Sequence, residues 1–178
     1  MPFFRRRLPH WQPEDKPLFL TWSLAGALPK NRYPPPGSLS AGKAFVWMDR
    51  CLDGASSGPT WLRRDDVAQI VTDALRHGSE TLKYYDLYAY VVMPNHVHVL
   101  VLPFVPASKL LQSLKGFTAH AANKALGRNG EFWQSESYDH WVRDPAEFER
   151  IRKYIEENPV RAGLAGCPED YPWSSARG

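Results

Sequence analysis

The chain has 178 residues, of which 43% are hydrophobic, and a formal net charge of +3 at pH 7. This length allows one domain with a buried core, so a single domain over residues 1–178 is expected. Two cysteines, Cys51 and Cys167, exclude a disulfide-rich scaffold and fit a reducing cytoplasm. Because no signal-type segment and no run of about 18 apolar residues occurs, neither export nor membrane insertion is expected.

The sequence predicts alternating strands and helices, the pattern of an α+β domain. A central hairpin between amphipathic helices indicates a ferredoxin-like, RRM-like fold, in which an antiparallel sheet packs against helices. The predicted elements in chain order are a strand at 18–24, an irregular Pro- and Gly-rich insertion at about 25–60 with a short helix at 43–52, a helix at 65–77, strands at 84–92 and 97–102, a helix at 108–126 with Leu110, Leu111, Leu114, Phe117 and Ala121 inward, a strand at 138–143 and a helix at 144–158.

The hairpin carries two histidines, His96 and His98, separated by one valine. Side chains alternate faces along a strand, so both imidazoles are expected on one face, roughly 7 Å apart along it. Two imidazoles on one side of a stiff strand can bind one divalent metal ion. From the pair alone, a structural role on a polar sheet face is about equally well supported.

The last predicted helix carries a second polar pair. Asp144 is its expected N-cap, Pro145 suits the first helical position, and Pro159 is expected to end the helix after Asn158. Tyr154 and Asn158 are one turn apart and project from the border of the buried face. A tyrosine at such a border is usually a packing residue, but its polar i+4 neighbour favours a chemical role.

Six short motifs follow one another along the chain and cover it from about residue 60 to the end. They are Met93–Leu100, Leu114–Ala119, Gly130–Gln134, Tyr138–His140, Tyr154–Leu164 and Trp173–Ala176. In sequence and order they resemble the single-tyrosine HUH transposases, and within these the REP-associated tyrosine transposases of bacteria. The histidine motif alone is moderately specific, and the five further motifs make the resemblance strong.

The resemblance implies a role for each matching residue. His96 and His98 correspond to the metal-binding pair on a central strand, and Tyr154 corresponds to the nucleophile on a C-terminal helix. Asn158 takes the position of a polar helix residue that assists at the metal, and that residue is glutamine in some relatives. The implied cofactor is a divalent metal ion, Mg²⁺ or Mn²⁺.

The implied reaction requires these residue types. Phosphodiester cleavage needs an in-line nucleophile and stabilisation of charge on the phosphoryl oxygens, which a divalent ion provides. A tyrosine hydroxyl is a poor nucleophile at neutral pH unless a metal or a base assists it. The family pattern implies a 5′-phosphotyrosine and a free 3′-OH, so strands are rejoined without ATP. Accordingly, the chain has no GxxxxGK[ST] phosphate loop.

The implied partner is single-stranded DNA with hairpins of the repetitive palindromic kind. Basic residues flank the candidate active site and suit a phosphate backbone, although any one group is more often solvated surface. The family allows a monomer or a homodimer, and the expected location is the bacterial cytoplasm, in association with the nucleoid. The residues expected to contact DNA are Arg63, Arg64, Lys109, Lys115, Lys124, Arg152, Lys153 and Arg161.

Two other functions remain open. A catalytically inactive nucleic-acid-binding module, derived from such a transposase, would keep the same fold. A zinc hydrolase that uses water in place of tyrosine lacks a convincing third protein ligand in the sequence. Tyr138, followed by Asp139 and His140, is a less favoured candidate for the nucleophile.

Overall fold

The computed structural model describes residue 13 and residues 15–28, 41–54 and 57–178. The insertion predicted at about 25–60 therefore lies partly outside the described residues, and the helix expected within it is present as α1. Among the described residues, no helix is both long and apolar enough to cross a membrane. The elements are β1 (Leu18–Ser23), α1 (Ala41–Asp53), η1 (Trp61–Arg63), α2 (Asp65–Glu80), β2 (Tyr85–Val92), β3 (His96–Pro103), α3 (Ala107–Leu126), β4 (Tyr138–Trp141), α4 (Pro145–Arg161), η2 (Pro168–Asp170) and η3 (Ser175–Arg177).

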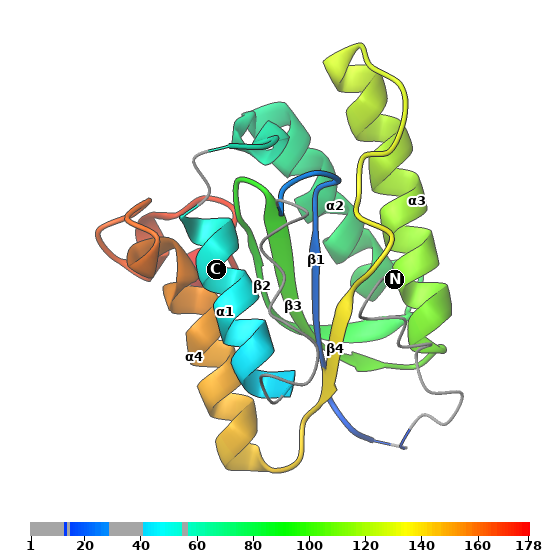
Figure 1. The fold of residues 1–178 in the computed structure, drawn as a ribbon. Helices are drawn as coiled ribbons and strands as arrows, with labels where there is room; N and C mark the ends of the chain where they lie inside the picture. The colour runs from blue at the N-terminus through cyan, green and yellow to red at the C-terminus, as the bar shows by residue number, and fades with distance from the viewer. Residues whose placement is uncertain (1–12, 14, 29–40, 55–56) are drawn as a thin grey trace.

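The strands form one antiparallel sheet in the order β2-β3-β1-β4 (Figure 1). This order, with a hairpin of β2 and β3 between α2 and α3, confirms the predicted ferredoxin-like α+β fold. β3 lies between β2 and β1 and is buried on both faces of the sheet. Its apolar run is therefore continuous rather than alternating.

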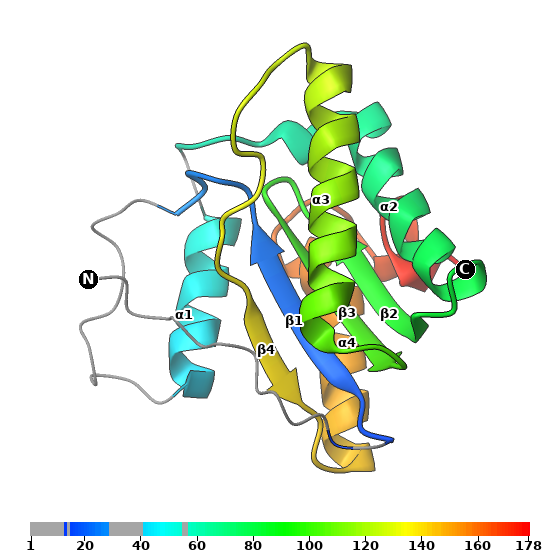
Figure 2. The ribbon, with the colours of Figure 1, turned by 90° about the vertical axis from the view of Figure 1, so that its right-hand side faces the viewer.

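Helices cover both faces of the sheet (Figure 2). α2 and α3 lie over one face, here called the α2/α3 face, and α1 and α4 lie over the other, the α1/α4 face. Side chains of β1 alternate between the two: Leu20 and Trp22 belong to the larger hydrophobic cluster with α2 and α3. Phe19 belongs to a smaller cluster with Phe45 of α1 and Ile155 of α4. The candidate site lies on the α1/α4 face.

The helix α4 runs to Arg161, so the end predicted at Asn158 is wrong. Proline has no backbone N–H, which removes one hydrogen bond of the helical ladder at Pro159. The last turn is held by bonds from Ala162 N to the Asn158 carbonyl (3.0 Å) and from Leu164 N to the Pro159 carbonyl (2.8 Å). Pro159 is buried, so packing also favours the helical conformation.

Phe117 of α3 is 62% exposed, so its predicted inward position is wrong. The next residue, Thr118, is buried in its place. The hydroxyl of Thr118 donates to the Leu114 carbonyl (2.6 Å) and accepts from Trp133 Nε1 (2.9 Å). A hydroxyl with both partners satisfied can replace an apolar side chain in a core, and periodicity alone does not foresee such partners.

Candidate metal and tyrosine site

His96 and His98 lie side by side at the start of β3, on the α1/α4 face. Both are fully buried, and their ring centroids are 4.7 Å apart. β1 pairs with this part of β3, with Thr21 opposite His98 and Ser23 opposite His96. The alternation of a strand thus brings both imidazoles to one face, as the sequence predicted.

Neighbouring polar groups fix the orientation of both rings. Nδ1 of His96 lies 2.7 Å from Asn95 Oδ1, and Asn95 Nδ2 donates to the Leu52 carbonyl (2.9 Å), which orients the amide. Nδ1 of His98 lies 2.6 Å from the Thr21 hydroxyl. Because each Nδ1 already has a partner, the Nε2 atoms are left for a different contact.

That contact is Asp49 of α1, a residue that the sequence analysis did not identify. Asp49 Oδ1 lies 2.9 Å from His98 Nε2 and 3.3 Å from His96 Nε2, and the residue is 4% exposed. Burial alone would raise the pKa of this carboxyl. The neighbouring imidazoles of His98 and His96 outweigh burial and hold the pKa well below its usual range. The donor atoms of the three residues lie within 4.8 Å of one another, so this buried group could hold a metal ion.

The position of Asp49 leaves a signal in the sequence. Phe45, Asp49 and Leu52 fall on one side of α1, and all three are buried. An acidic residue within an apolar helix stripe indicates a buried carboxylate that needs a partner. Asp49 also offers a third ligand atom beside the two imidazoles, so the objection that a zinc hydrolase lacks such a residue is wrong.

Asp53 follows one turn later on α1. Its Oδ1 lies 3.9 Å from His96 Nε2. This oxygen is buried and has no hydrogen-bond partner among the described residues. Burial raises the pKa of Asp53 to about 6, with a further contribution from Asp49 that His96 and Arg161 partly oppose. Two carboxyl groups therefore lie beside the imidazoles.

The helix α4 brings Tyr154 and Asn158 to the same place. The ring centroids of Tyr154 and His98 are 5.8 Å apart, and the guanidinium carbon of Arg161 lies 3.9 Å from the Tyr154 centroid. Asn158 is fully buried, and its Nδ2 donates to Asp49 Oδ2 at 3.4 Å. Asn158 Oδ1 has no hydrogen-bond partner in the described part of the chain. The i, i+4 pair therefore faces the Asp-His-His group.

The start of α4 is fixed by a cap and a buried carboxylate. Asp144 accepts from the backbone N of Glu147 (2.8 Å), as predicted for the N-cap. The Glu147 carboxylate accepts from the guanidinium of Arg143 (2.8 Å) and from its backbone N (2.7 Å), and lies 3.0 Å from His140 Nε2. The bond from the Arg143 side chain is the main reason that the pKa of Glu147 falls to about 2. These contacts join β4 to α4 and so set the position of Tyr154.

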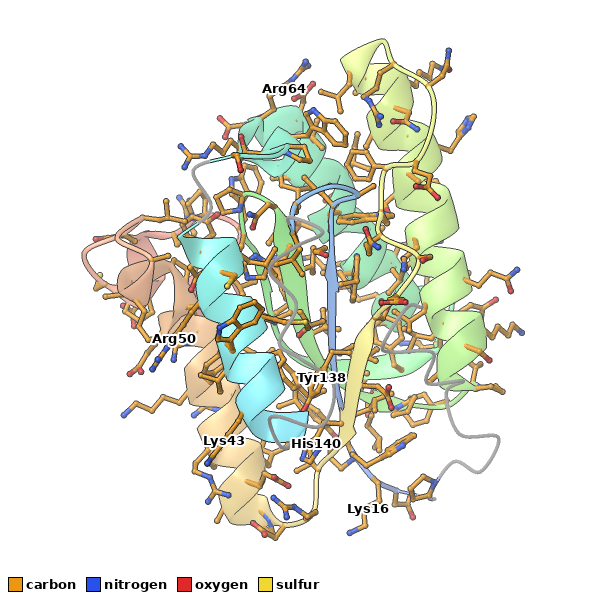
Figure 3. The ribbon with its side chains drawn as sticks, viewed as in Figure 1. Lys16, Lys43, Arg50, Arg64, Tyr138 and His140 are labelled. Carbon is orange, nitrogen blue, oxygen red and sulfur yellow. The ribbon has the colours of Figure 1, made fainter. Side chains whose placement is uncertain are left out.

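Tyr138, the other candidate nucleophile, belongs to the same aromatic cluster. Its ring stacks on Phe45 with centroids 4.4 Å apart, and Phe45 lies 6.0 Å from Tyr154. Figure 3 shows Tyr138 and His140 on β4, beside the lower end of α1. The ring of Tyr154, by contrast, lies directly against that of His98.

The eight basic residues expected at DNA are not brought together. Three lie on α3, on the far face of the sheet from the histidines, and three lie on α4. The other two lie at the end of η1, where the backbone N of Leu62 donates to the Pro94 carbonyl (3.2 Å), close to His96. The residues on α3 are Lys109, Lys115 and Lys124, those on α4 are Arg152, Lys153 and Arg161, and those at the end of η1 are Arg63 and Arg64.

Some of these cations are engaged within the protein. The Lys115 ammonium donates to the carbonyls of residues 134 (2.7 Å) and 135 (3.2 Å), and burial lowers its pKa to about 8. Arg152 forms ion pairs with acidic neighbours on its own helix. The structure adds two cations that the sequence analysis missed: Lys43 and Arg50 are exposed on α1, on its side next to α4 (Figure 3).

Comparison with known proteins gives matches at the level of sequence. Residues 61–158 match the family described as "Transposase IS200 like". The chain is 24% identical over 110 residues to a Haemophilus influenzae protein described as a REP-associated tyrosine transposase; this covers 54% of the chain and 62% of that relative, less than two thirds of its length. It is 26% identical over 132 residues to the REP-associated tyrosine transposase of Escherichia coli K12, covering 66% of the chain and 76% of that relative.

A solved structure matches the fold. It is the structure of a REP-associated tyrosine transposase bound to a REP hairpin, with a TM-score of 0.61 and 19% sequence identity. The match covers 99% of this chain and 84% of that one. It places the sheet and its helices in a known architecture.

Proposed function

Because the chain belongs to the IS200-like transposase family, which matches more than half of it, we propose that it cleaves and rejoins single-stranded DNA through a covalent bond to Tyr154. The membership confirms the predicted resemblance to single-tyrosine transposases, and the similarity to REP-associated relatives agrees with the predicted branch. The proposed activity is that of a metal-dependent endonuclease and strand transferase at hairpin-forming repetitive palindromic DNA.

One observation carries this proposal: a tyrosine lies against a buried group that can hold a metal ion. The rings of Tyr154 and His98 are 5.8 Å apart between centroids, within a single chain. Nucleophilic catalysis requires the nucleophile and its activating group to lie close together on rigid elements. A strand and a capped helix provide such elements here.

We expect His96, His98 and Asn158 to hold the ion, Mg²⁺ or Mn²⁺. His96 Nε2 and Asn158 Oδ1 are buried and lack hydrogen-bond partners among the described residues, as expected for atoms whose partner is a cation. When bound, the ion polarises a phosphoryl oxygen of the DNA and stabilises the charge that develops on it.

Tyr154 supplies the nucleophile. Its phenol oxygen loses a proton to solvent and forms a bond to the scissile phosphorus. The bond from phosphorus to the 3′ oxygen breaks, and that oxygen takes up a proton and leaves as a free 3′-OH. In the reverse direction a 3′-OH attacks the 5′-phosphotyrosine and releases the phenol, so joining needs no ATP. The guanidinium of Arg161 stacks on the Tyr154 ring and holds it in place.

We propose that the DNA strand runs over the α1/α4 face. Supporting residues are Arg63 and Arg64 at the histidine end of the sheet and the cations of α4 and α1, which are Arg152, Lys153, Arg161, Lys43 and Arg50. A hairpin is proposed because the structural relative binds a REP hairpin. We further propose that residues 1–178 act as one domain, as a monomer or a homodimer, in the cytoplasm at the nucleoid.

Capture of the covalent adduct tests this function. The substrate is a single-stranded hairpin library with randomised flanking bases, labelled at the 3′ end and incubated with the protein and Mn²⁺. The wild type is expected to give a labelled adduct that survives denaturing electrophoresis. Tyr154→Phe should give none, because only the attacking oxygen is removed, whereas Tyr138→Phe should still form it.

Each alternative gives a different result. An inactive binding module retains the library on a filter but forms neither adduct nor product. A hydrolase that uses water cleaves without an adduct, and its Tyr154→Phe variant remains active. An adduct that persists in Tyr154→Phe and disappears in Tyr138→Phe would move the nucleophile to β4.

A further inference from the structure

The helix α1 has no role in the sequence motifs, and the family match begins after it, at residue 61. Yet α1 places two carboxyl groups, Asp49 and Asp53, one turn apart beside His96. Asp49 is almost completely buried, and such a residue needs a compensating charge. The positive charge that compensates Asp49 comes either from the two imidazoles or from a bound cation.

The hydrogen bonds around His96 favour a bound cation. Asn95 uses its Nδ2 on the Leu52 carbonyl, so its Oδ1 faces His96 and can only accept. His96 Nδ1 is therefore the donor of that bond, and Nε2 is the ring nitrogen that faces Asp49. Nε2 has no hydrogen-bond partner among the described residues, although Asp49 Oδ1 lies 3.3 Å from it. A buried ring nitrogen beside a carboxylate oxygen, with no hydrogen bond between them, is the arrangement of two ligands of one cation.

The distances match those between the ligands of one ion. Two neighbouring ligands of an octahedral ion with bonds of 2.0–2.1 Å lie about 3 Å apart. Asp49 Oδ1 lies 2.9 Å from one Nε2 and 3.3 Å from the other. Asn158 also orients the carboxylate, since its Nδ2 donates to the second oxygen of Asp49. Ligands oriented by such hydrogen bonds are typical of built metal sites.

We propose that Asp49 is a direct ligand of the divalent ion, together with His96 and His98, and that Asp53 holds a water molecule of its outer shell. This inference rests on the proposed function and deepens it. A carboxylate favours Mg²⁺ and Mn²⁺, which prefer oxygen ligands, over the softer ions that imidazoles favour. α1 is then one wall of the active site rather than part of an irregular insertion.

Metal binding, measured by calorimetry with Mn²⁺ and no DNA, tests the proposal separately from catalysis. Asp49→Asn is expected to weaken Mn²⁺ binding more than about 100-fold, and Asp53→Asn about 10-fold, because loss of an outer-shell partner costs 10–100-fold. Asp73→Asn, an exposed carboxylate of α2 on the other face of the sheet, is the matched control and should bind as the wild type does.

A second variant covers the case in which Asp49→Asn does not fold. Asp49→Cys should lose Mn²⁺ binding and gain Cd²⁺ binding, because a thiolate prefers soft ions. A ligand role predicts a new thiolate-to-Cd²⁺ absorption band that is absent from the wild type, whose own cysteines are Cys51 and Cys167. A merely structural role for Asp49 predicts no such band.

The outcomes separate this proposal from the proposed function. Wild-type Mn²⁺ affinity in Asp49→Asn, or no Cd²⁺ band in Asp49→Cys, overturns the ligand role while the adduct assay can still succeed. Mn²⁺ binding that depends on Asp49 but is accompanied by no adduct leaves the metal site in place and rejects the transposase chemistry. If the wild type binds no Mn²⁺, both fail.

Discussion

The two faces of the sheet are built from the same strands, and they differ in what those strands bury. On the α2/α3 face, Leu20 and Val99 lie in a large hydrophobic cluster. On the α1/α4 face, the neighbouring positions hold Thr21 and His98, and both are buried as well. A shift of one residue along β1 or β3 therefore separates a packed core from a polar site.

The difference has an energetic meaning. Buried apolar side chains stabilise the fold in proportion to the area they remove from water. A buried polar group contributes little net stability even when its hydrogen bonds are made, and it costs about 1–3 kcal/mol when they are not. His96 Nε2, Asn158 Oδ1 and Asp53 Oδ1 lack such partners among the described residues. The larger hydrophobic cluster therefore lies on the α2/α3 face, and the three partnerless atoms of the candidate site lie together on the α1/α4 face.

The largest effect is expected from loss of the metal. His96→Ala, or excess chelator with the wild type, should reduce cleavage of single-stranded hairpins more than about 100-fold, because a direct ligand matters more than an outer-shell one. The melting temperature should stay within a few degrees of wild type, since the apolar core is untouched. His77→Ala, an exposed histidine of α2, is the control and should leave cleavage unchanged. Full activity in chelator would remove the metal from the mechanism.

A substitution in the hydrophobic cluster tests the α2/α3 face. Leu20 is fully buried under α2 and α3, and Leu20→Ala should cost about 2–5 kcal/mol of unfolding free energy, measured by chemical denaturation. Mn²⁺ affinity below the unfolding transition should be unchanged. Tyr154→Phe should show the opposite pattern, with no adduct and stability within about 0.5 kcal/mol of wild type. A loss of metal binding in Leu20→Ala would mean that the two faces are not independent.

The DNA path can be assigned to one face by salt dependence. Each lost phosphate contact should reduce the slope of log binding constant against log salt by about 1. Arg63→Ala, close to the histidine turn, should do so, whereas Lys124→Ala on α3 should leave the slope unchanged. Nothing in the residue pattern alone distinguishes these two cations. Equal effects would show that the DNA contacts both faces.

A preference for single-stranded over duplex DNA follows from the position of Tyr154 on the α1/α4 face. Tyr154 lies on a helix beside the sheet, where an unpaired strand reaches it more easily than a duplex, whose opening costs a few kcal/mol. Cleavage of a single-stranded hairpin should therefore exceed cleavage of the same sequence in full duplex by at least about tenfold. A side-by-side gel assay measures this ratio, and equal rates would reject a single-strand substrate.

The sequence predicts the positions that the period of a single helix or strand determines. Contacts between elements depend on long-range packing and could not be predicted in this way. The spacing of His96 and His98 on a strand, and of Tyr154 and Asn158 on a helix, follows from the period of each element. No period could bring Asp49 to the histidines, because their contact joins residues 47 and 49 positions apart, with η1, α2 and β2 between them. Thr118, likewise, is buried in place of Phe117 because Trp133 Nε1 donates a hydrogen bond to the Thr118 hydroxyl.

The smallest expected effect concerns how α4 is anchored on the α1/α4 face. The pKa of Glu147 is about 2 in the folded protein, against an ordinary value of 4.5. Since the folded value is lower, the carboxylate stabilises the fold above about pH 4.5, and this stability is lost as the pH falls from about 4.5 to 2. We expect roughly 1–2 kcal/mol, because Arg143 is exposed and its charge is screened. Glu147→Gln should therefore be less stable than wild type at pH 7 and equal to it near pH 2, by urea denaturation. Glu149→Gln, an exposed glutamate of the same helix, should show no such convergence. A constant difference at both pH values would mean that Glu147 acts through packing, and that α4 is not held to β4 by charge.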